Sequence, residues 1–381
     1  MAAGPFHNRG RSISLFVGLI AVATLIALVV ASTGSARARG SCYGKTATIT
    51  GTNGSDNIKL TANKDIVDAK GGNDTIQANS TRTNHGKDII CGGSGNDKIA
   101  GNNENNILIG GPGNDQLKGA PGDDLVVGDN ANPNGAESGP TGSDELNGTG
   151  GKDFLVGDNY ATGNASGASP DKDLVGLDGN DKVIGDDASL QGNANGGKSD
   201  RLAGADGNDL VIGDSYAPHG NASGSGDDEK STSNPKAGLN AGPGDDVLIG
   251  DNYTGSGTAS GGGNDDLAGA DGGDFAVKCK ANDPCEDTFY GDNFAASCVP
   301  NTSPQAQASH AVIQCEATRA PGGGVDRLTP DQGNDFMNGG PPDTGGHNGK
   351  DPDTCSGGTG IDTATRCTPI KDGAEHVIPF P

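Results

Sequence analysis

Residues 92–100 read Gly-Gly-Ser-Gly-Asn-Asp-Lys-Ile-Ala, and residues 110–118 read Gly-Gly-Pro-Gly-Asn-Asp-Gln-Leu-Lys. Both match the pattern G-G-x-G-x-D-x-U-x, in which U is a large apolar residue. The glycines favour a tight turn, because they reach backbone conformations with positive φ that other residues avoid. The residues after the aspartate predict a short strand whose U side chain points inward. A nine-residue unit of turn and strand therefore decides the fold.

The aspartate of this unit recurs along the chain in steps of nine residues. From Asp88 the step passes through residues 97, 106, 115 and 124, with Asn106 as the one substitution. The apolar position two residues later recurs in the same way. The candidate metal ligands are the aspartates in this phase: Asp56, Asp65, Asp74, Asp88, Asp97, Asp115, Asp124, Asp144, Asp153, Asp181, Asp200, Asp209, Asp246, Asp265, Asp274, Asp326, Asp335 and Asp362. The candidate turn glycines are Gly92, Gly93, Gly95, Gly110, Gly111, Gly113, Gly122, Gly179, Gly207 and Gly244.

These units resemble the hemolysin-type calcium-binding repeat, the RTX nonapeptide of secreted bacterial proteins. With interruptions, the resemblance covers about residues 50–365. It implies an all-β fold, a parallel β-roll of nine-residue half-turns, two of which complete a coil. It also implies several calcium ions, each held between adjacent turns by oxygens from both. Carboxylate and carbonyl oxygens are the ligands that calcium prefers.

Stacked carboxylates make folding depend on a cation. At strand spacing, two of them repel by roughly 3–4 kcal/mol at an effective dielectric constant near 20. At ten times the dissociation constant, each bound ion contributes about 1.4 kcal/mol to stability. We therefore expect the roll to form only when calcium is present.

The composition supports this interpretation over a conventional globular core. Glycine supplies 68 of 381 residues, against 8 Phe, 5 Tyr and no Trp. The net charge of -24 disfavours nucleic-acid binding and favours cations. Simple disorder is the rival, but disorder does not predict acidic and apolar residues in fixed phase.

The N-terminus is typical of a secretory signal. Residues 1–38 contain Arg9 and Arg11, an apolar stretch from residue 13 to residue 31, and Ala-Arg-Ala at residues 36–38. An uncleaved membrane anchor is the alternative, because the apolar stretch could span a bilayer. Beyond it we divide the chain into an N-terminal RTX roll (39–127), repeats with inserts (128–278) and a cysteine-containing region with residual repeats (279–381).

The cysteines all lie beyond this segment, and their even number in an exported chain predicts disulfides rather than a zinc site. Proximity suggests three C-terminal pairs and a disulfide-stapled cap, leaving Cys42 to pair with Cys91. The candidates are Cys42, Cys91, Cys279, Cys285, Cys298, Cys315, Cys355 and Cys367.

A longer unit begins at residue 128, where Gly-Asp-Asn or a variant opens each block. The markers start at Gly128, Gly157, Gly185, Gly213, Gly250 and Gly291. We interpret the residues after each marker as irregular loops leaving the roll. The alternative is a binding edge made by the marker aspartates and by Tyr160, Tyr216 and Tyr253, which would serve adhesion. Two half-turns look decayed, because Lys172 (between Asp171 and Asp173) and Ala237 fall in the aspartate phase.

No enzyme is predicted. The sequence lacks H-E-x-x-H and G-x-S-x-G, and no stretch outside the repeats is long enough for a catalytic domain. The leading hypothesis is an exported, calcium-binding structural or surface-associated protein, monomeric and without a nucleic-acid partner. The alternatives are a calcium-dependent adhesion module, with a cell-surface or polysaccharide partner, and a disordered acidic calcium buffer.

Overall fold

The computed structural model describes residues 40–77, 86–228, 242 and 246–260, and otherwise only the backbone of the strands named below. These residues belong to one compact unit, Gly40–Pro381. They form strands and turns, and none of the described residues belongs to a helix long and apolar enough to cross a membrane. The all-β prediction is confirmed for this part of the chain, whereas the expected signal at residues 1–38 lies outside it.

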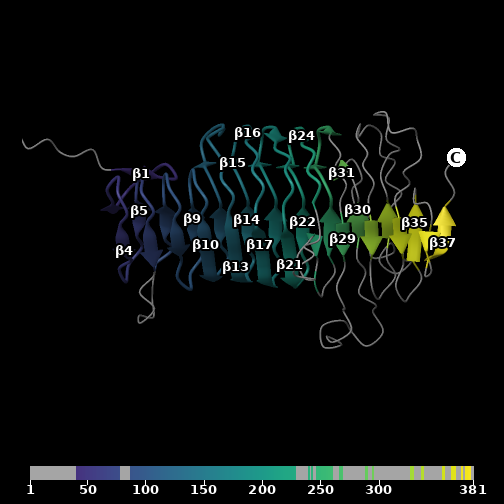
Figure 1. Cartoon of the computed structure of the whole chain (residues 1–381), viewed down its shortest axis with the longest axis horizontal. Helices are drawn as coiled ribbons and strands as arrows, with labels where there is room; N and C mark the ends of the chain where they lie inside the picture. Colours follow the sequence, from purple (N-terminus) through teal and green to yellow (C-terminus); the bar gives the residue numbers. More distant parts are fainter. Residues whose placement is uncertain are drawn as a thin grey trace, which may run out of the picture. The chain divides into compact units, whose positions relative to one another are not determined.

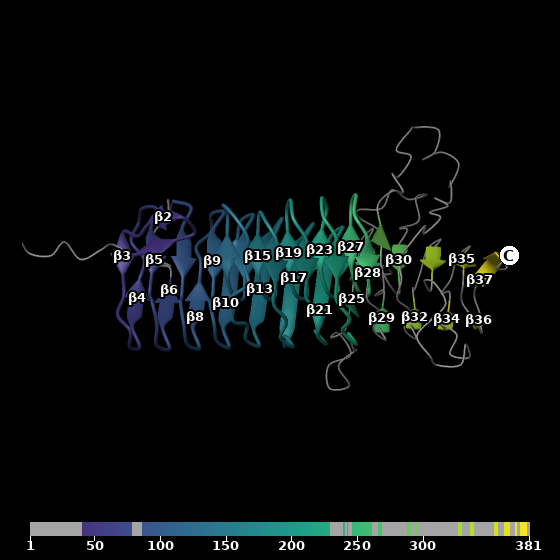
Figure 2. The ribbon, with the colours of Figure 1, turned by 90° about the horizontal axis from the view of Figure 1, so that it is seen from above.

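Consecutive strands alternate between two long parallel sheets (Figures 1 and 2). A short antiparallel pair, β1 (Ser41–Cys42) and β2 (Lys45–Thr46), precedes them. The first sheet contains β4 (Asn57–Lys59), β6 (Thr75–Gln77), β8 (Lys98–Ala100), β10 (Gln116–Pro121), β13 (Glu145–Gly151), β17 (Asp173–Gly179), β21 (Leu202–Asp206), β25 (Leu239–Asn240), β29 (Asp266–Ala268), β32 (Arg327–Thr329), β34 (Thr354–Ser356) and β36 (Ile370–Lys371). The second contains β3 (Ile49–Thr50), β5 (Ile66–Asp68), β7 (Ile89–Cys91), β9 (Ile107–Ile109), β11 (Leu125–Val127), β14 (Phe154–Val156), β18 (Lys182–Ile184), β22 (Leu210–Ile212), β26 (Val247–Ile249), β30 (Thr288–Tyr290), β33 (Phe336–Asn338), β35 (Asp362–Thr365) and β37 (Ala374–Ile378).

The U residues form the core between these two sheets. In the first sheet Ile76 pairs in register with Ile99, and Ile99 with Leu117. In the second sheet Leu108 pairs with Val126. Side chains alternate between the faces of a strand, so one apolar residue per half-turn points inward. Both columns of U residues belong to one buried cluster, as the nine-residue period predicts.

The inserts after residue 128 also form ordered strands, so the prediction of irregular loops is wrong for the described inserts. One parallel sheet contains β12 (Ala131–Asn132), β15 (Tyr160–Ala161), β19 (Ala188–Ser189), β23 (Tyr216–Ala217), β27 (Tyr253–Thr254) and β31 (Phe294–Ala295). Another contains β16 (Ala165–Ser166), β20 (Ala194–Asn195), β24 (Ala222–Ser223) and β28 (Ala259–Ser260). In Figure 1 the strands β15, β16 and β24 lie above β14 and β22 of the second main sheet. Each insert repeats the course of the one before, so its backbone groups pair with the next coil.

The insert strands cover the outer face of the second main sheet. There Val156, Ile184 and Ile212 are buried together with Tyr160 and Tyr216 in a second apolar cluster. Tyr160 and Tyr216 are only 7% and 8% exposed. The inserts therefore provide a second hydrophobic layer, which the tyrosines help to build.

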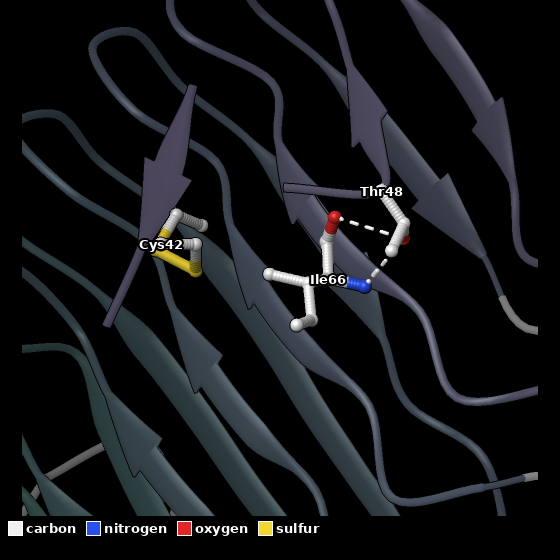
Figure 3. The surroundings of a disulfide bond; sticks show 4 residues. Cys42, Thr48 and Ile66 are labelled. Carbon is white, nitrogen blue, oxygen red and sulfur yellow. Dashed lines mark hydrogen bonds between the residues drawn. A yellow bond between two sulfur atoms is a disulfide. The ribbon is translucent and has the colours of Figure 1, made fainter. Parts of the chain in front are cut away.

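One disulfide joins Cys42 on β1 to Cys91 at the end of β7, with a Cα–Cα distance of 5.7 Å (Figure 3). This pairing confirms the prediction for these two cysteines. Nearby, the Thr48 hydroxyl accepts a hydrogen bond from the Ile66 backbone N–H at 2.9 Å. The other six cysteines, and with them the disulfide-stapled cap, lie outside the residues whose side chains are described, although the backbone of β30 to β37 continues both sheets.

Candidate metal centres

The phase aspartates stack in two columns, one before the strands of each main sheet. Ladder 1 precedes the first sheet and consists of Asp56, Asp74, Asp97, Asp115, Asp144, Asp171, Asp200 and Asp228. Ladder 2 precedes the second sheet and consists of Asp65, Asp88, Asn106, Asp124, Asp153, Asp181, Asp209 and Asp246.

After the first member of each column, one carboxylate oxygen of each ladder aspartate is held by the backbone of the previous coil. The backbone N–H of Asp97 donates to Asp115 Oδ1 at 2.7 Å, and that of Asp115 donates to Asp144 Oδ1 at 2.7 Å. The same bond recurs in ladder 2, for example from Asp153 to Asp181 Oδ1 at 2.8 Å. These bonds fix the carboxyl groups in line along the stack.

The second oxygen is buried, and no hydrogen-bond donor of the described residues reaches it in most ladder positions. An ionised oxygen in that state costs several kcal/mol unless a cation or proton compensates it. The ladder atoms concerned include Oδ2 of Asp74, Asp97, Asp115, Asp124, Asp144, Asp153, Asp171, Asp181, Asp200 and Asp209.

Backbone carbonyls face these open oxygens. A Cβ on Gly110, the first glycine of its turn, would collide with both Asp115 Oδ2 and the carbonyl oxygen of Gly128. On Gly148 it would meet Asp153 Oδ2 and, at 2.8 Å, the Gly176 carbonyl oxygen of the next coil. The first glycine is thus required by close approach, since a side chain there would fill the space between carboxylate and carbonyl.

Asn106 shows which carbonyls surround that space. Its Nδ2 donates to the carbonyl oxygens of Asn102 at 2.8 Å and Glu104 at 2.6 Å, and lies 3.5 Å from that of Gly119. Asn102 and Glu104 are the second and fourth residues of the turn that ends at Asn106, and Gly119 is the first residue of the corresponding turn in the next coil. The amide therefore occupies the point on which three carbonyls converge, where the other half-turns place an open carboxylate oxygen.

Asn102 closes a second site in the same manner. Its Nδ2 donates to Asp88 Oδ2 at 2.7 Å and to the Gly86 carbonyl oxygen at 3.1 Å. At the first coils, Asp56 Oδ2 and Asp65 Oδ2 accept the backbone N–H of Thr52 and Thr61, each at 2.6 Å. These half-turns satisfy their carboxylates with protein donors.

The donor set identifies the kind of ion. Among residues 40–77, 86–228 and 246–260, no three His, Cys, Asp or Glu side chains converge tightly enough to hold a metal by themselves. A site must therefore combine one or two carboxylates with backbone carbonyls. Such an all-oxygen set fits a hard cation of flexible coordination such as calcium.

Burial raises the pKa of the ladder aspartates. The pKa of Asp97 rises to about 6, that of Asp124 to about 7 and that of Asp144 to about 8, in each case mainly through desolvation. For Asp124, the neighbouring carboxylate of Asp153 raises the pKa further. In the absence of a cation, these carboxyl groups therefore bind protons near neutral pH.

The predicted glycines serve two purposes. Gly93, Gly95, Gly111, Gly113, Gly122, Gly179 and Gly207 have positive φ, between 98° and 157°. Gly92 and Gly110 do not, and are required by close approach instead. Ala120, Thr149, Leu177 and Ala205 occupy the second turn position with φ between 77° and 89°, a conformation that favours glycine. Gly244 lies outside the described residues.

The two half-turns interpreted as decayed need correction. Asp171, not Lys172, occupies ladder 1: its backbone N–H donates to Asp200 Oδ1 at 2.7 Å, while its own Oδ1 accepts from Asp144 at 2.7 Å. Lys172 is an exposed extra residue before β17. Ala237 is not among the described residues, and Asp228 fills the ladder position, accepting from Asp200 at 2.8 Å.

Counting nine residues back from the next aspartate missed these positions, because the inserts interrupt the turn rather than follow it. Gly157 and Gly213 act as first glycines for Asp171 and Asp228, since a Cβ on either would collide with that carboxylate. The side chains of the candidates Asp265, Asp274, Asp326, Asp335 and Asp362 lie outside the described residues.

The comparison with protein families agrees with this geometry. The RTX calcium-binding nonapeptide repeat (4 copies) matches residues 46–76, 82–99, 100–132, 139–159 and 195–215. The chain contains RTX calcium-binding repeats in these segments. The matched RTX segments include most of the ladder aspartates described above. A search among curated proteins finds no match to the chain.

Sequence reasoning did not include the aspartates of the Gly-Asp-Asn markers among the candidate metal ligands and considered them only for a binding edge. Asp129, Asp158, Asp186, Asp214 and Asp251 are fully buried, which contradicts a binding edge made by their side chains. A signal for their burial was present, because each follows an apolar pair and a glycine, for example Val183, Ile184 and Gly185 before Asp186.

Proposed function

We propose that this protein is an exported structural or surface-associated protein whose RTX repeats fold only when calcium is bound. The observation that carries the proposal is the repeated open oxygen: a buried ladder carboxylate, aimed at backbone carbonyls, that no protein donor satisfies. One such oxygen recurs in successive half-turns, so the cost of leaving it uncompensated grows with every coil.

The energies favour an unfolded chain without calcium. Each open oxygen costs about 1–3 kcal/mol even before repulsion between neighbours is counted. Ten of them cost roughly 10–30 kcal/mol, which matches or exceeds the 5–15 kcal/mol that stabilises a typical domain. An ion bound at one hundred times its dissociation constant returns about 2.7 kcal/mol per site. Export of an unfolded chain into a calcium-rich exterior is the setting in which this exchange is useful.

The role we propose is non-enzymatic. The acidic side chains of both ladders are stacked in columns, and ion ligation explains the stacking without a substrate. The adhesion alternative relied on Tyr160, Tyr216 and Tyr253, but Tyr160 and Tyr216 are buried, and the rings of Tyr216 and Tyr253 stack at 5.1 Å. These side chains are better explained as packing between insert strands and the second main sheet.

The test is far-UV circular dichroism of the chain without residues 1–38, titrated with calcium and then with a chelator. We expect a cooperative and reversible gain of β signal. Binding of calcium by calorimetry without any gain of β signal would instead indicate the disordered acidic buffer. A full β signal in excess chelator at neutral pH would contradict the proposal, because the ladders would then be stable without ions.

A further inference from the structure

The marker aspartates form a third column beside ladder 1. Asp158 interacts directly with the carboxyl groups of Asp129 and Asp186, and Asp214 acts on Asp186 from the following coil. Asp186 is fully buried, and its ladder 1 neighbour Asp200 is 1% exposed. Of the charged groups around Asp186, Asp200 acts on it most strongly. Two buried carboxylates per coil therefore lie together in this part of the chain.

In Asp186 and Asp129, one carboxylate oxygen is fixed by a backbone N–H. Asp186 Oδ2 accepts the N–H of Lys198 at 3.1 Å, and Asp129 Oδ2 accepts that of Gly142 at 3.0 Å. No N–H group and no hydroxyl of the described residues donates to Asp186 Oδ1 or Asp129 Oδ1, and the neighbouring acidic group of both side chains is the carboxyl of Asp158. The open oxygen is therefore positioned, buried and unsatisfied, as it is in the ladders.

A backbone carbonyl completes the arrangement in the Asp186 coil. Gly185 is the first glycine of the expanded turn, and a Cβ on it would collide with the Gly213 carbonyl oxygen and come within 2.6 Å of Asp200 Oδ2. Asp186 follows Gly185 directly. Gly128 has the corresponding place before Asp129, facing Asp144 Oδ2 and the Gly157 carbonyl oxygen.

Charge sets the stoichiometry. A coil of the insert region contributes one marker carboxylate and one ladder 1 carboxylate, which one divalent cation neutralises. In ladder 2 the same coil contributes a single phase carboxylate. We propose that in these coils the calcium site of ladder 1 requires the marker aspartate as a second carboxylate ligand, with Asp186, Asp200 and the Gly213 carbonyl as one such site and Asp129, Asp144 and the Gly157 carbonyl as another.

The coil between these two sites is different. The Ser169 hydroxyl donates to Asp158 Oδ1 at 2.5 Å and the Ser169 N–H donates to Asp158 Oδ2 at 3.0 Å. Both oxygens of Asp158 are thus already hydrogen-bonded, and we assign no ion to it. The alternative for the other two coils is a carboxyl group kept neutral by a proton, which needs no metal.

The test compares the double variant Asp129→Asn/Asp186→Asn with the single variant Asp187→Asn, each in the full chain. An asparagine at position 129 or 186 can keep its bond to the backbone N–H while replacing the open oxygen by an NH₂ group. Asp187 is the matched control, because it is equally buried but both of its oxygens already accept backbone N–H groups, from Asn159 and Gly167. Bound calcium is counted by equilibrium dialysis and elemental analysis.

The inference rests on calcium-dependent folding of the chain, and the two can fail separately. If the wild type gains neither ions nor β structure, the proposed function fails. If the wild type folds with calcium, we expect the double variant to hold two ions fewer and Asp187→Asn to hold the wild-type number. An unchanged count in a folded double variant would overturn the inference and favour protonated carboxyls.

A double variant that does not fold in saturating calcium, while Asp187→Asn does, supports the inference, because a neutral carboxyl would tolerate an isosteric amide. Should both fail to fold, the single variant Asp129→Asn decides by the same count. Its carboxylate belongs to the first marker of the column. The loss of one ion is then the expected result, and no loss overturns the inference.

Discussion

Replacing Asn106 with aspartate should create a calcium site in ladder 2. The side chain already lies at the ladder position, since Asp88 N–H donates to Asn106 Oδ1 at 3.2 Å. Its amide occupies the point where the carbonyls of Asn102, Glu104 and Gly119 converge. A carboxylate oxygen there would face the same carbonyls, with which it cannot hydrogen-bond. Only a cation between them can restore the balance.

The magnitude follows from these contacts. Without calcium, Asn106→Asp loses two good hydrogen bonds, worth about 1 kcal/mol each, and leaves a buried oxygen unsatisfied at a further cost of about 1–3 kcal/mol. The calcium-free fold should therefore be destabilised by roughly 3–5 kcal/mol. At one hundred times the dissociation constant, the new site returns about 2.7 kcal/mol. The variant should need more calcium to fold, respond more steeply to it and bind one additional ion.

The assay is a calcium titration followed by circular dichroism, with bound ions counted at saturation. Asn103→Asp is the matched control, because it makes the same chemical change on an exposed side chain of the same turn. We expect the control to keep the wild-type midpoint and ion count. A folded Asn106→Asp protein with the wild-type ion count would refute the reasoning, because the carbonyls that hold an amide would then be unable to hold a cation.

Three further predictions concern pH, the disulfide and the backbone. Burial raises the folded-state pKa of Asp115 to about 9. The stability that its protonated carboxyl gives to the calcium-free fold is therefore complete below about pH 4 and is lost as the pH rises toward 9. Circular dichroism in chelator should show a gain of β signal on acidification, and a flat profile would contradict this. Replacing Cys42 and Cys91 with serine opens a loop of 49 residues. This should lower the free energy of unfolding in saturating calcium by about 4 kcal/mol. An unchanged urea midpoint would show that the disulfide does not stabilise the N-terminal coils. Ala205 has a φ of 78°, a conformation that favours glycine, whereas Ala203 lies in the extended part of β21. The Ala205→Gly protein should therefore be at least about 1 kcal/mol more stable than the control Ala203→Gly protein. Equal stabilities would argue against strain at Ala205.

The sequence was sufficient for the features that depend on the nine-residue period alone. Ile99 and Leu117 stack in register because both their turns contain a full set of glycines and their strands follow at the same distance. Asp97 and Asp115 stack for the same reason. In these coils every turn has the same length, so counting residues is equivalent to following the chain in space.

Counting failed where an insert interrupts the turn. Gly157 and Asp171 belong to one turn although thirteen residues separate them, and the extra residue Lys172 then shifts the phase by one. Residue spacing cannot distinguish an insertion inside a turn from one between turns. Only the backbone pairing between coils decides it, here by placing Glu145 opposite Asp173.

A different signal would have located the ordered inserts. In the coils that inserts cover, the residue after U is apolar, as in Val156, Ile184 and Ile212, whereas in the early coil of β5 it is Asp68. An apolar residue on the outer face of a strand needs a covering layer. The change of pattern along the second main sheet therefore marks where insert strands must lie.

Asn102 and Asn106 show that this backbone can close a turn without any ion. If stability alone governed the ladder positions, an amide in each half-turn would satisfy the converging carbonyls and remove the repulsion between carboxylates. The chain instead has aspartate at every described ladder position except Asn106. In the insert coils, Asp129 and Asp186 add further open oxygens. Each of these choices makes a coil less stable by itself and more dependent on a cation. The amide-closed coil thus gives the reference against which the calcium dependence of every other coil can be measured.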